Sequence, residues 1–209
     1  MSRPATDSAQ KLIEAGRKQV YKTGLSGLSV RHVAADAKVN LGLFHYHFKS
    51  KNRFGRALLQ GLYEEFFEKL TLEVSGEGTP VDRLRRVLIL MGGMAREHRK
   101  LLVALFQDTV TGYQPTIEFL KANVFRHVSV VMGLVREGQT QGFLKKMPEP
   151  VAMGFLMSSV GLPSVIVEVI GRSKAKEPFG KPFVEIEKLL LSDETIALRV
   201  DMAIKGLLK

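Results

Sequence analysis

Residues 29–48 of this chain read SVRHVAADAKVNLGLFHYHF, and this stretch decides the fold. Ser29 and Asn40 each stand where a side-chain oxygen caps the first turn of a helix. Val39 falls in the turn between the two helices, and Phe44 lies one turn into the second helix. The pattern predicts two short helices joined by a tight turn, and a second helix of this size fits the major groove of DNA.

Positive charge is concentrated around this stretch. The chain of 209 residues has a formal net charge of +10. Residues 1–60 contain 11 Lys and Arg against 3 Asp and Glu, whereas residues 61–209 contain 20 against 18. A basic module joined to a nearly neutral body indicates a polyanionic partner, and both nucleic acid and an anionic membrane surface meet that description.

The rest of the chain reads as helical, so we expect an all-α protein with a three-helix DNA-binding domain at 1–50 and a larger helical domain at 51–209. The first helix is expected to begin at Asp7 and to end at Gly24. Residues 171–182 read as a flexible connector. Further helices are expected at about 50–74, 81–98, 100–111, 115–140, 150–170 and 192–208.

The only signs of the cellular location are two features that are absent from the sequence. There is no cysteine, and the first ten residues are too polar for a secretory leader, so we expect a cytoplasmic protein. Residues 150–170 are long and apolar enough to span a bilayer, but they include serines, glycines and Pro163. We therefore expect a helix buried in protein and no membrane partner.

The run from Leu28 to Leu59, especially LSVRHVAADAKVNLGLFHYHFKSKNRF, resembles the N-terminal domain of the TetR (tetracycline-repressor-like) family. The matching pattern is a run of aromatic residues at the end of the second helix, followed by Lys-Ser-Lys. Leu43 and His45 depart from it, because the family often has Thr or Ser at the first position and usually Tyr at the second. The resemblance implies a homodimeric regulator that binds a palindromic operator. It also implies an effector pocket in the body, and repression released by a small molecule.

The candidate DNA-contacting residues lie in or beside the two short helices. Lys49 and Lys51 flank the predicted cap Ser50 and suit phosphate binding, and His45 and Tyr46 are placed to donate to backbone oxygens. The full set is Ser29, Arg31, Asn40, Leu41, Gly42, Leu43, His45, Tyr46, Lys49 and Lys51. For Asn40, helix capping and a base contact both remain open. His45 and His47 are two residues apart and face different sides of a helix, which disfavours a metal pair and makes His47 a structural residue.

The body offers candidates for ligand binding and for association. An unknown, largely apolar effector is expected to contact Met94, Phe106, Phe125, Met132 and Met157, although each of these side chains also suits a core. The final helix repeats apolar residues at a spacing that suits a partner helix, so 150–170 and 192–208 are expected to form the homodimer interface. Packing within one chain is the alternative. The repeating residues are Ile196, Val200, Ala203 and Leu207.

The sequence therefore predicts a ligand-responsive transcriptional regulator, most simply a repressor, that binds DNA as a homodimer. It contains no phosphate-binding glycine loop, zinc-protease motif or nucleophile elbow, so neither an enzyme nor a cofactor or metal is expected. Two alternatives remain. One is a helical binding protein whose basic end docks on anionic membrane or acidic protein, and the other is an enzyme that turns over a bound small molecule.

Overall fold

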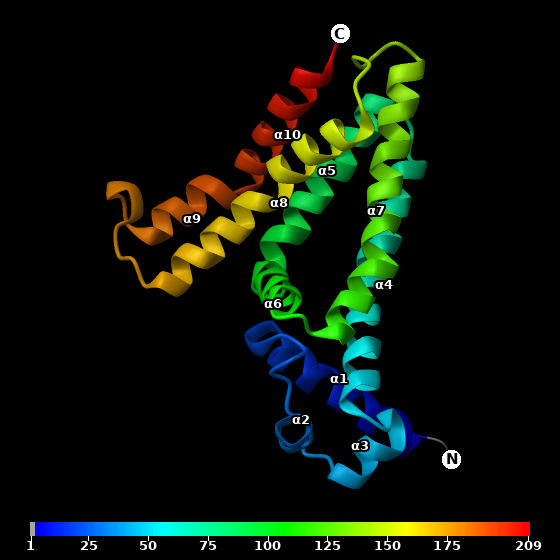
Figure 1. Ribbon diagram of the computed structural model, residues 1–209, viewed down its shortest axis with the longest axis vertical. Helices are drawn as coiled ribbons and strands as arrows, with labels where there is room; N and C mark the ends of the chain where they lie inside the picture. The colour runs from blue at the N-terminus through cyan, green and yellow to red at the C-terminus, as the bar shows by residue number, and fades with distance from the viewer. Residues whose placement is uncertain (1–2) are drawn as a thin grey trace. The chain divides into compact units, whose positions relative to one another are not determined.

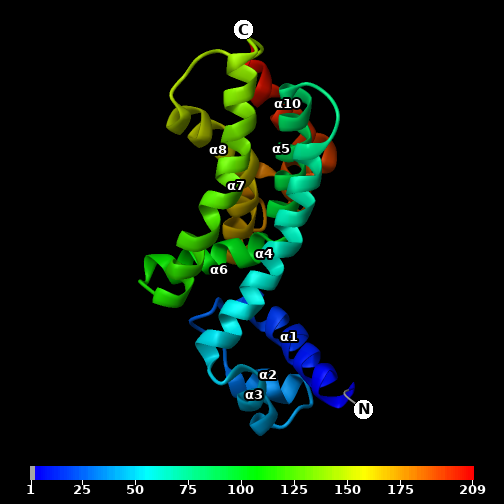
Figure 2. The same ribbon diagram turned by 90° about the vertical axis from the view of Figure 1, so that its right-hand side faces the viewer.

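A computed structural model describes residues 3–209 of the chain, with side chains from Asp7 onward (Figures 1 and 2). Within these residues every regular element is a helix, which confirms the predicted all-α class. The elements are α1 (Arg3–Thr23), α2 (Val30–Asp36), α3 (Leu41–Phe48), α4 (Lys51–Ser75), α5 (Pro80–Glu97), α6 (Arg99–Val110), α7 (Gln114–Thr140), α8 (Glu149–Ser173), the 3₁₀ turn η1 (Pro178–Gly180), α9 (Phe183–Leu191) and α10 (Asp193–Leu207).

The first helix begins earlier than the sequence indicated. α1 starts at Arg3, so Asp7 lies inside the helix and forms an ion pair with Lys11 at 2.7 Å instead of capping it. The end of α1 is as predicted, because Gly24 has φ +68° and its N–H donates to the Val20 carbonyl oxygen at 3.0 Å. A charged pair one turn apart gives no signal that separates a helix interior from a helix start.

The chain forms two compact units, and the first is larger than the domain expected at 1–50. It comprises residues 3–65 together with Lys100–Asn123. The additional segments belong to it because Leu101 and Leu105 of α6 and Phe119 of α7 are buried in the same core as α1–α4. We call this the N-terminal unit. The division of the chain into a DNA-binding part and an effector-binding part stays a functional prediction.

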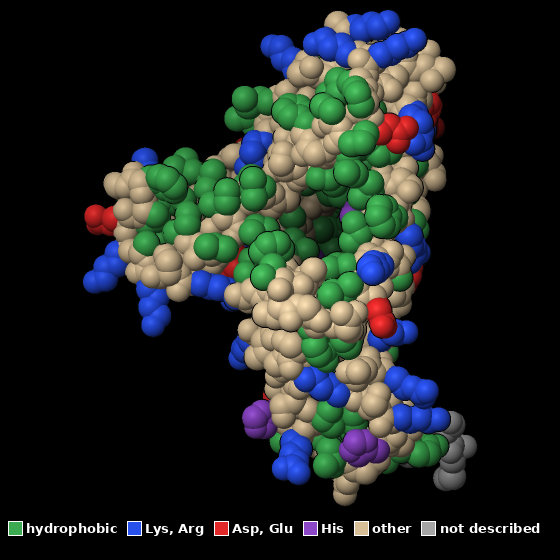
Figure 3. Space-filling view, in the orientation of Figure 1, with side chains coloured by type: hydrophobic (Ala, Val, Ile, Leu, Met, Phe, Trp, Pro, Cys, Tyr) green, Lys and Arg blue, Asp and Glu red, His purple; other side chains and the backbone are tan. Residues whose placement is uncertain are grey.

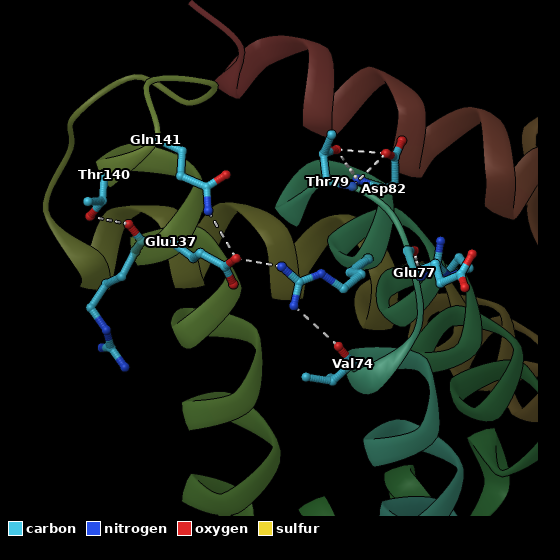
Figure 4. Close-up of polar contacts among 10 residues, drawn as sticks. Val74, Glu77, Thr79, Asp82, Glu137, Thr140 and Gln141 are labelled. Carbon is cyan, nitrogen blue, oxygen red and sulfur yellow. Dashed lines mark hydrogen bonds and ion pairs between the residues drawn. The ribbon is translucent and has the colours of Figure 1, made fainter.

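The second compact unit, here the C-terminal unit, comprises Phe66–Arg99 and Val124–Lys209. Its helices α5, α8 and α10 pack against one another around a core that also includes the C-terminal half of α7. Figure 4 shows how polar contacts fix one end of it. Thr79 and Asp82 cap the start of α5 reciprocally, and hydrogen bonds from Thr79 lower the pKa of the Asp82 carboxyl group. Glu137 of α7 accepts from Arg83 at 2.5 Å and from Gln141 at 3.2 Å.

The apolar repeat of α10 was wrongly assigned to a partner chain. Its four members are all buried within their own unit: Ile196, Val200, Ala203 and Leu207. They pack against α5 and α8, so the intramolecular alternative is correct for these residues. A repeat of apolar residues specifies that one face is covered but does not specify which chain covers it.

The helix expected to be buried in protein, α8, is buried on one side only. It is the one described helix long and apolar enough to cross a membrane by length and composition, and 28% of its most apolar window is buried. Its other side carries an exposed apolar stripe, and Figure 3 shows hydrophobic side chains gathered over α8, α9 and α10. The stripe consists of Val151, Phe155, Leu162, Ile166 and Val169. Next to it α10 exposes Leu198 and Met202.

α8 runs through Pro163 as one continuous helix. Proline has no N–H, so the carbonyl oxygen of Ser159, four residues earlier, has no helical donor at this point. Arg199 of α10 supplies one, because its Nε donates to the Ser159 oxygen at 3.2 Å while its Nη1 donates to the Leu190 carbonyl oxygen. Burial lowers the pKa of Arg199 from its ordinary value, which still leaves the guanidinium charged.

The expected connector is partly helical. α8 continues past Gly171 to Ser173, where Lys174 takes the left-handed conformation with φ +58°, and η1 occupies the middle of the segment. α9 follows and was not predicted. It is held by Arg99, which donates to Glu187 of α9 at 2.5 Å and lies 3.6 Å from Glu168 of α8.

Candidate nucleic-acid interface

α2 is fixed by its first turn and by α1. The Ser29 hydroxyl accepts from the His32 N–H at 3.4 Å, as the sequence predicted for a cap. The Ser29 N–H in turn donates to the Gln19 side chain of α1 at 2.9 Å. Val33 is fully buried, and Arg31 is exposed. α2 therefore has one side held in the core and the other open to solvent.

The turn between α2 and α3 is tight. Lys38 has φ +54°, and the Val39 N–H donates to the Ala34 carbonyl oxygen at 2.9 Å, which brings Val39 against the core as expected. The Asn40 side chain accepts from the Gly42 N–H at 2.7 Å, so Asn40 does cap α3. Ala34 is buried at the contact with the core, whereas the next residue, Ala35, is exposed.

α3 has one buried anchor and an exposed outer side. Phe44 is fully buried, with its ring centroid 5.6 Å from that of Phe48 and 5.0 Å from that of Phe54. Figures 1 and 2 show α3 beside α2 in both views. On the outer side, Leu43 is 43% exposed and Tyr46 is 73% exposed. Leu41, Gly42 and His45 share that exposure.

The two histidines of α3 have different partners. His47 Nε2 lies 2.8 Å from the Ser8 hydroxyl of α1, so His47 joins α3 to α1, as predicted. His45 is exposed, and its Nδ1 lies 3.4 Å from the Lys49 carbonyl oxygen. Among the described residues no group of three or more His, Asp or Glu side chains is placed to hold a metal ion.

The two lysines predicted to bind phosphate at the start of α4, Lys49 and Lys51, have different surroundings in the structure. The Ser50 hydroxyl accepts from the Arg53 N–H at 3.2 Å, which makes Ser50 the expected cap. Lys49 has φ +62° and an exposed side chain. Lys51 is half-buried, and its Nζ donates to the Ser26 carbonyl oxygen at 2.7 Å. The Lys51 ammonium group is therefore tied to the α1–α2 loop in a solvent-exposed contact, whereas the Lys49 side chain is exposed.

Two basic residues beside α3 were missed by the sequence reasoning. Lys38 lies in the turn before α3 and Arg53 in the first turn of α4, and both side chains are exposed. With Arg31 and Lys49 they make four exposed positive charges on the segments next to α3. The available signal was their position directly beside the predicted caps Asn40 and Ser50, where a docked phosphate would lie.

The five side chains proposed to contact an effector differ in burial, and Phe106 belongs to the N-terminal unit whereas the other four belong to the C-terminal unit. Phe106 of α6 is 65% exposed and Phe125 of α7 is 70% exposed, so neither is enclosed. Met132 is buried in the core of the C-terminal unit, and Met157 packs against that core. Met94 on α5 is half-buried. Sequence composition identified these side chains as apolar without indicating which side of each helix they occupy.

The C-terminal unit also contains a half-buried histidine, which the sequence offers only as a lone histidine on a helix, with no catalytic partner. His127 of α7 has its ring centroid 5.8 Å from that of Phe66 at near-perpendicular orientation. Burial lowers the pKa of His127 to about 4, so its imidazole is neutral at physiological pH. It is a polar group beside an otherwise apolar core.

Comparison with known proteins points to one family. Residues 12–58 match the family model described as bacterial regulatory proteins, tetR family. The HTH-type transcriptional repressor NemR of Escherichia coli is 33% identical over 79 residues, which is 37% of this chain and 40% of NemR. The matched stretch therefore spans well under half of that relative's length.

Solved structures extend the likeness over the whole chain. A TetR transcription regulator from Haloarcula marismortui has a TM-score of 0.73 at 15% identity, covering 98% of this chain and 100% of that one. The ketosteroid transcriptional regulator KstR2 of Mycobacterium tuberculosis has a TM-score of 0.69 at 17% identity, covering 96% and 95%. At these identities the likeness concerns the fold.

Proposed function

We propose that this chain is a transcriptional repressor that binds a palindromic operator as a homodimer and is released by a small molecule. The match of residues 12–58 to the tetR family of bacterial regulatory proteins, and the 33% identity to NemR over 79 residues, support the proposal. The observation that carries the proposal is the division of α3 into two sides. Phe44 anchors one side in the core, while the other is exposed between basic residues. An anchored helix with an open face and flanking cations suits the major groove.

Within this interface each residue type has a separate task. Lys38, Lys49 and Arg53 neutralise phosphates and set affinity without regard to sequence. Leu43 and Tyr46 reach base edges or sugar from the exposed side of α3. Leucine has no hydrogen-bonding group, so Leu43 is suited to contact with a thymine methyl group.

Replacing Leu43 by alanine is expected to relax the sequence preference at one base pair, with a loss of about 1–3 kcal/mol of discrimination at that base pair, while the salt dependence of binding stays the same.

Replacing Lys49 by alanine is expected to weaken binding to every sequence about equally and to reduce the slope of log K against log salt concentration by about 1. Binding assays on operator duplexes that differ by single base pairs, at several salt concentrations, distinguish the effect of Leu43→Ala from that of Lys49→Ala. A sequence effect from Lys49→Ala would contradict the phosphate assignment.

The proposal as a whole is tested by a gel-shift series. Duplexes from the DNA flanking the protein's own gene are compared with bulk DNA over a range of salt concentration. A repressor should lose affinity steeply with salt and keep a preference of about 10³-fold or more for one sequence. Salt-sensitive binding with no preferred sequence would instead support docking of the basic unit on an anionic surface. Anionic vesicles tested in parallel examine that alternative directly.

The homodimer is proposed to form through the exposed side of α8 with α10. Phe155 of α8 lies beside Gly206 of α10, where an added Cβ would be 3.7 Å from the ring, so the exposed stripes of the two helices adjoin. Leu162 is 50% exposed and Met202 is 65% exposed. A contiguous apolar face of this kind marks an interaction surface in a soluble protein. Two copies related by a two-fold axis would cover it as a four-helix arrangement.

The effector is proposed to bind in the C-terminal unit, among the half-buried apolar side chains beside its core. Met94, Met157 and the Phe66–His127 pair are the residues we assign to this role. A neutral imidazole in apolar surroundings suits a ligand with one hydrogen-bonding group on a largely apolar body. The effector acts through its different affinities for the DNA-bound and free states.

A further inference from the structure

The N-terminal unit contains a buried carboxylate whose partners lie on the loop between α1 and α2. Asp108 of α6 is 2% exposed. Its Oδ2 accepts from the Leu25 N–H at 2.8 Å, from the Ser26 N–H at 3.3 Å and from the Thr116 hydroxyl at 2.9 Å. Its Oδ1 accepts from the Ser26 hydroxyl. The carboxylate therefore has four donors, three of them in the α1–α2 loop.

The loop is shaped to admit this carboxylate. Gly24 ends α1 with φ +68°, and a Cβ at this position would lie 2.7 Å from Asp108 Oδ1 and 2.8 Å from Oδ2. Glycine is thus required twice, once for the left-handed conformation and once for the close approach of the carboxylate. A capping turn that only ended α1 would need the first property and not the second.

The same loop is held from its other side by α4. The Lys51 Nζ donates to the Ser26 carbonyl oxygen at 2.7 Å and lies 5.8 Å from the centroid of the Tyr113 ring. The Tyr113 hydroxyl donates to the Asn52 side chain at 3.2 Å. Ser26 therefore gives its donors to α6 and its acceptor to α4, so one loop residue joins both helices.

We propose that Asp108 is a positioning residue that fastens the α1–α2 loop to α6, so that α6 and the start of α7 move together with the helix-turn-helix. Residues 100–123 are then a part of the DNA-binding body inserted between two segments of the C-terminal unit. The chain crosses between this body and the C-terminal unit near residues 65, 100 and 123. Only the effect on operator binding rests on the function proposed above.

Amide hydrogen exchange measured by NMR tests the fastening without DNA. In the full chain, Asp108→Ala is expected to speed exchange of the Leu25 and Ser26 amides by about tenfold or more, since both lose their acceptor. The Phe44 amide, which donates to the Asn40 carbonyl oxygen, serves as the internal control and should keep its rate. Asp108→Asn retains one acceptor oxygen and should give a smaller increase. Unchanged loop amides in both variants would overturn the proposal.

Spin labels test the joint movement. The chain has no cysteine, so pairs of introduced cysteines are the only labelling sites. The exposed positions Lys22 on α1 and Val110 on α6 report across the fastening, and Lys11 with Lys22, both on α1, is a control pair. Asp108→Ala is expected to broaden the first distance distribution and to leave the second unchanged. A first distribution as narrow in the variant as in the parent would overturn the proposal. Asp108→Asn serves if the alanine variant fails to fold.

The effect of Asp108 on DNA binding is tested with a duplex that the parent protein itself enriches from a random library. Asp108→Ala should weaken binding to this duplex about tenfold with the base preference unchanged, and Asp108→Asn should recover part of the loss. An equal affinity of parent and alanine variant would overturn the positioning role. If the parent enriches no sequence, the proposed function fails, while the exchange and spin-label results still decide whether Asp108 fastens the loop.

Discussion

Replacing Phe44 by alanine is expected to lower the free energy of unfolding of the N-terminal unit by about 3–5 kcal/mol. The side chain is fully buried and its ring meets Phe48 and Phe54 near the junction of α3 with α4. Truncation removes this apolar surface and leaves a cavity beside the turn. Natural domains are stable by about 5–15 kcal/mol in total, so the unit that holds α3 would lose a large part of its free energy of unfolding.

The measurement can be confined to the unit that contains Phe44. The chain has no tryptophan, so a single Tyr21→Trp reporter in α1 follows urea unfolding of that unit by fluorescence. Phe106→Ala makes the same chemical change in the same unit at a side chain that is 65% exposed, and it should cost within about 0.5 kcal/mol. Equal losses from the two substitutions would show that Phe44 does not anchor α3.

If the proposed homodimer forms through the α8–α10 face, replacing Leu162 by arginine is expected to leave the protein monomeric and to weaken operator binding by about 10²–10⁴-fold. Leu162 lies in the middle of the exposed stripe of α8, where association would desolvate the new charge and leave it unpaired. Each monomer retains α3, so it still binds one half of the palindromic operator. The large loss comes from the second half-site, which no longer binds as part of the same molecule.

Sedimentation equilibrium and operator titrations measure the two effects on the same samples. Leu72→Arg on α4 is the matched control, because Leu72 is also an exposed leucine of the C-terminal unit but lies outside the α8–α10 face. It should leave both the mass and the affinity unchanged. A Leu162→Arg protein that stays dimeric would refute this face as the interface.

Local rules predicted most of the DNA-binding end. Ser29, Asn40 and Ser50 were identified as caps from the residue type and the pattern that follows, and each makes a capping hydrogen bond. The role of His47 was also predicted correctly, since its place on the inner side of α3 follows from helical spacing. The caps depend on residues within a few positions of one another, and a sequence displays such relations directly. For His47 only the side of the helix was predictable, because its partner Ser8 lies 39 positions away.

Relations between distant segments were not predictable in this way. The partner of Lys51 is the carbonyl oxygen of Ser26, 25 positions away, and the sequence gives no sign that this ammonium group binds the α1–α2 loop. Asp108 reads as one polar residue on an apolar helix until the fold brings the α1–α2 loop to it. The apolar repeat of α10 failed for a similar reason, because burial by a neighbouring helix and burial by a partner produce the same pattern.

The missing N–H of Pro163 has a mechanical consequence for the C-terminal unit. The gap it leaves in α8 is where Arg199 of α10 docks, through the hydrogen bond to Ser159. Neighbouring helices in regulatory proteins can ratchet past each other by one turn. Such a slide would remove the hydrogen bond between the Ser159 carbonyl oxygen and the half-buried guanidinium of Arg199, so this contact opposes sliding of α8 past α10. α8 and α10, which present the apolar face, are thereby kept in fixed register. The surface that they offer to a second copy is therefore rigid.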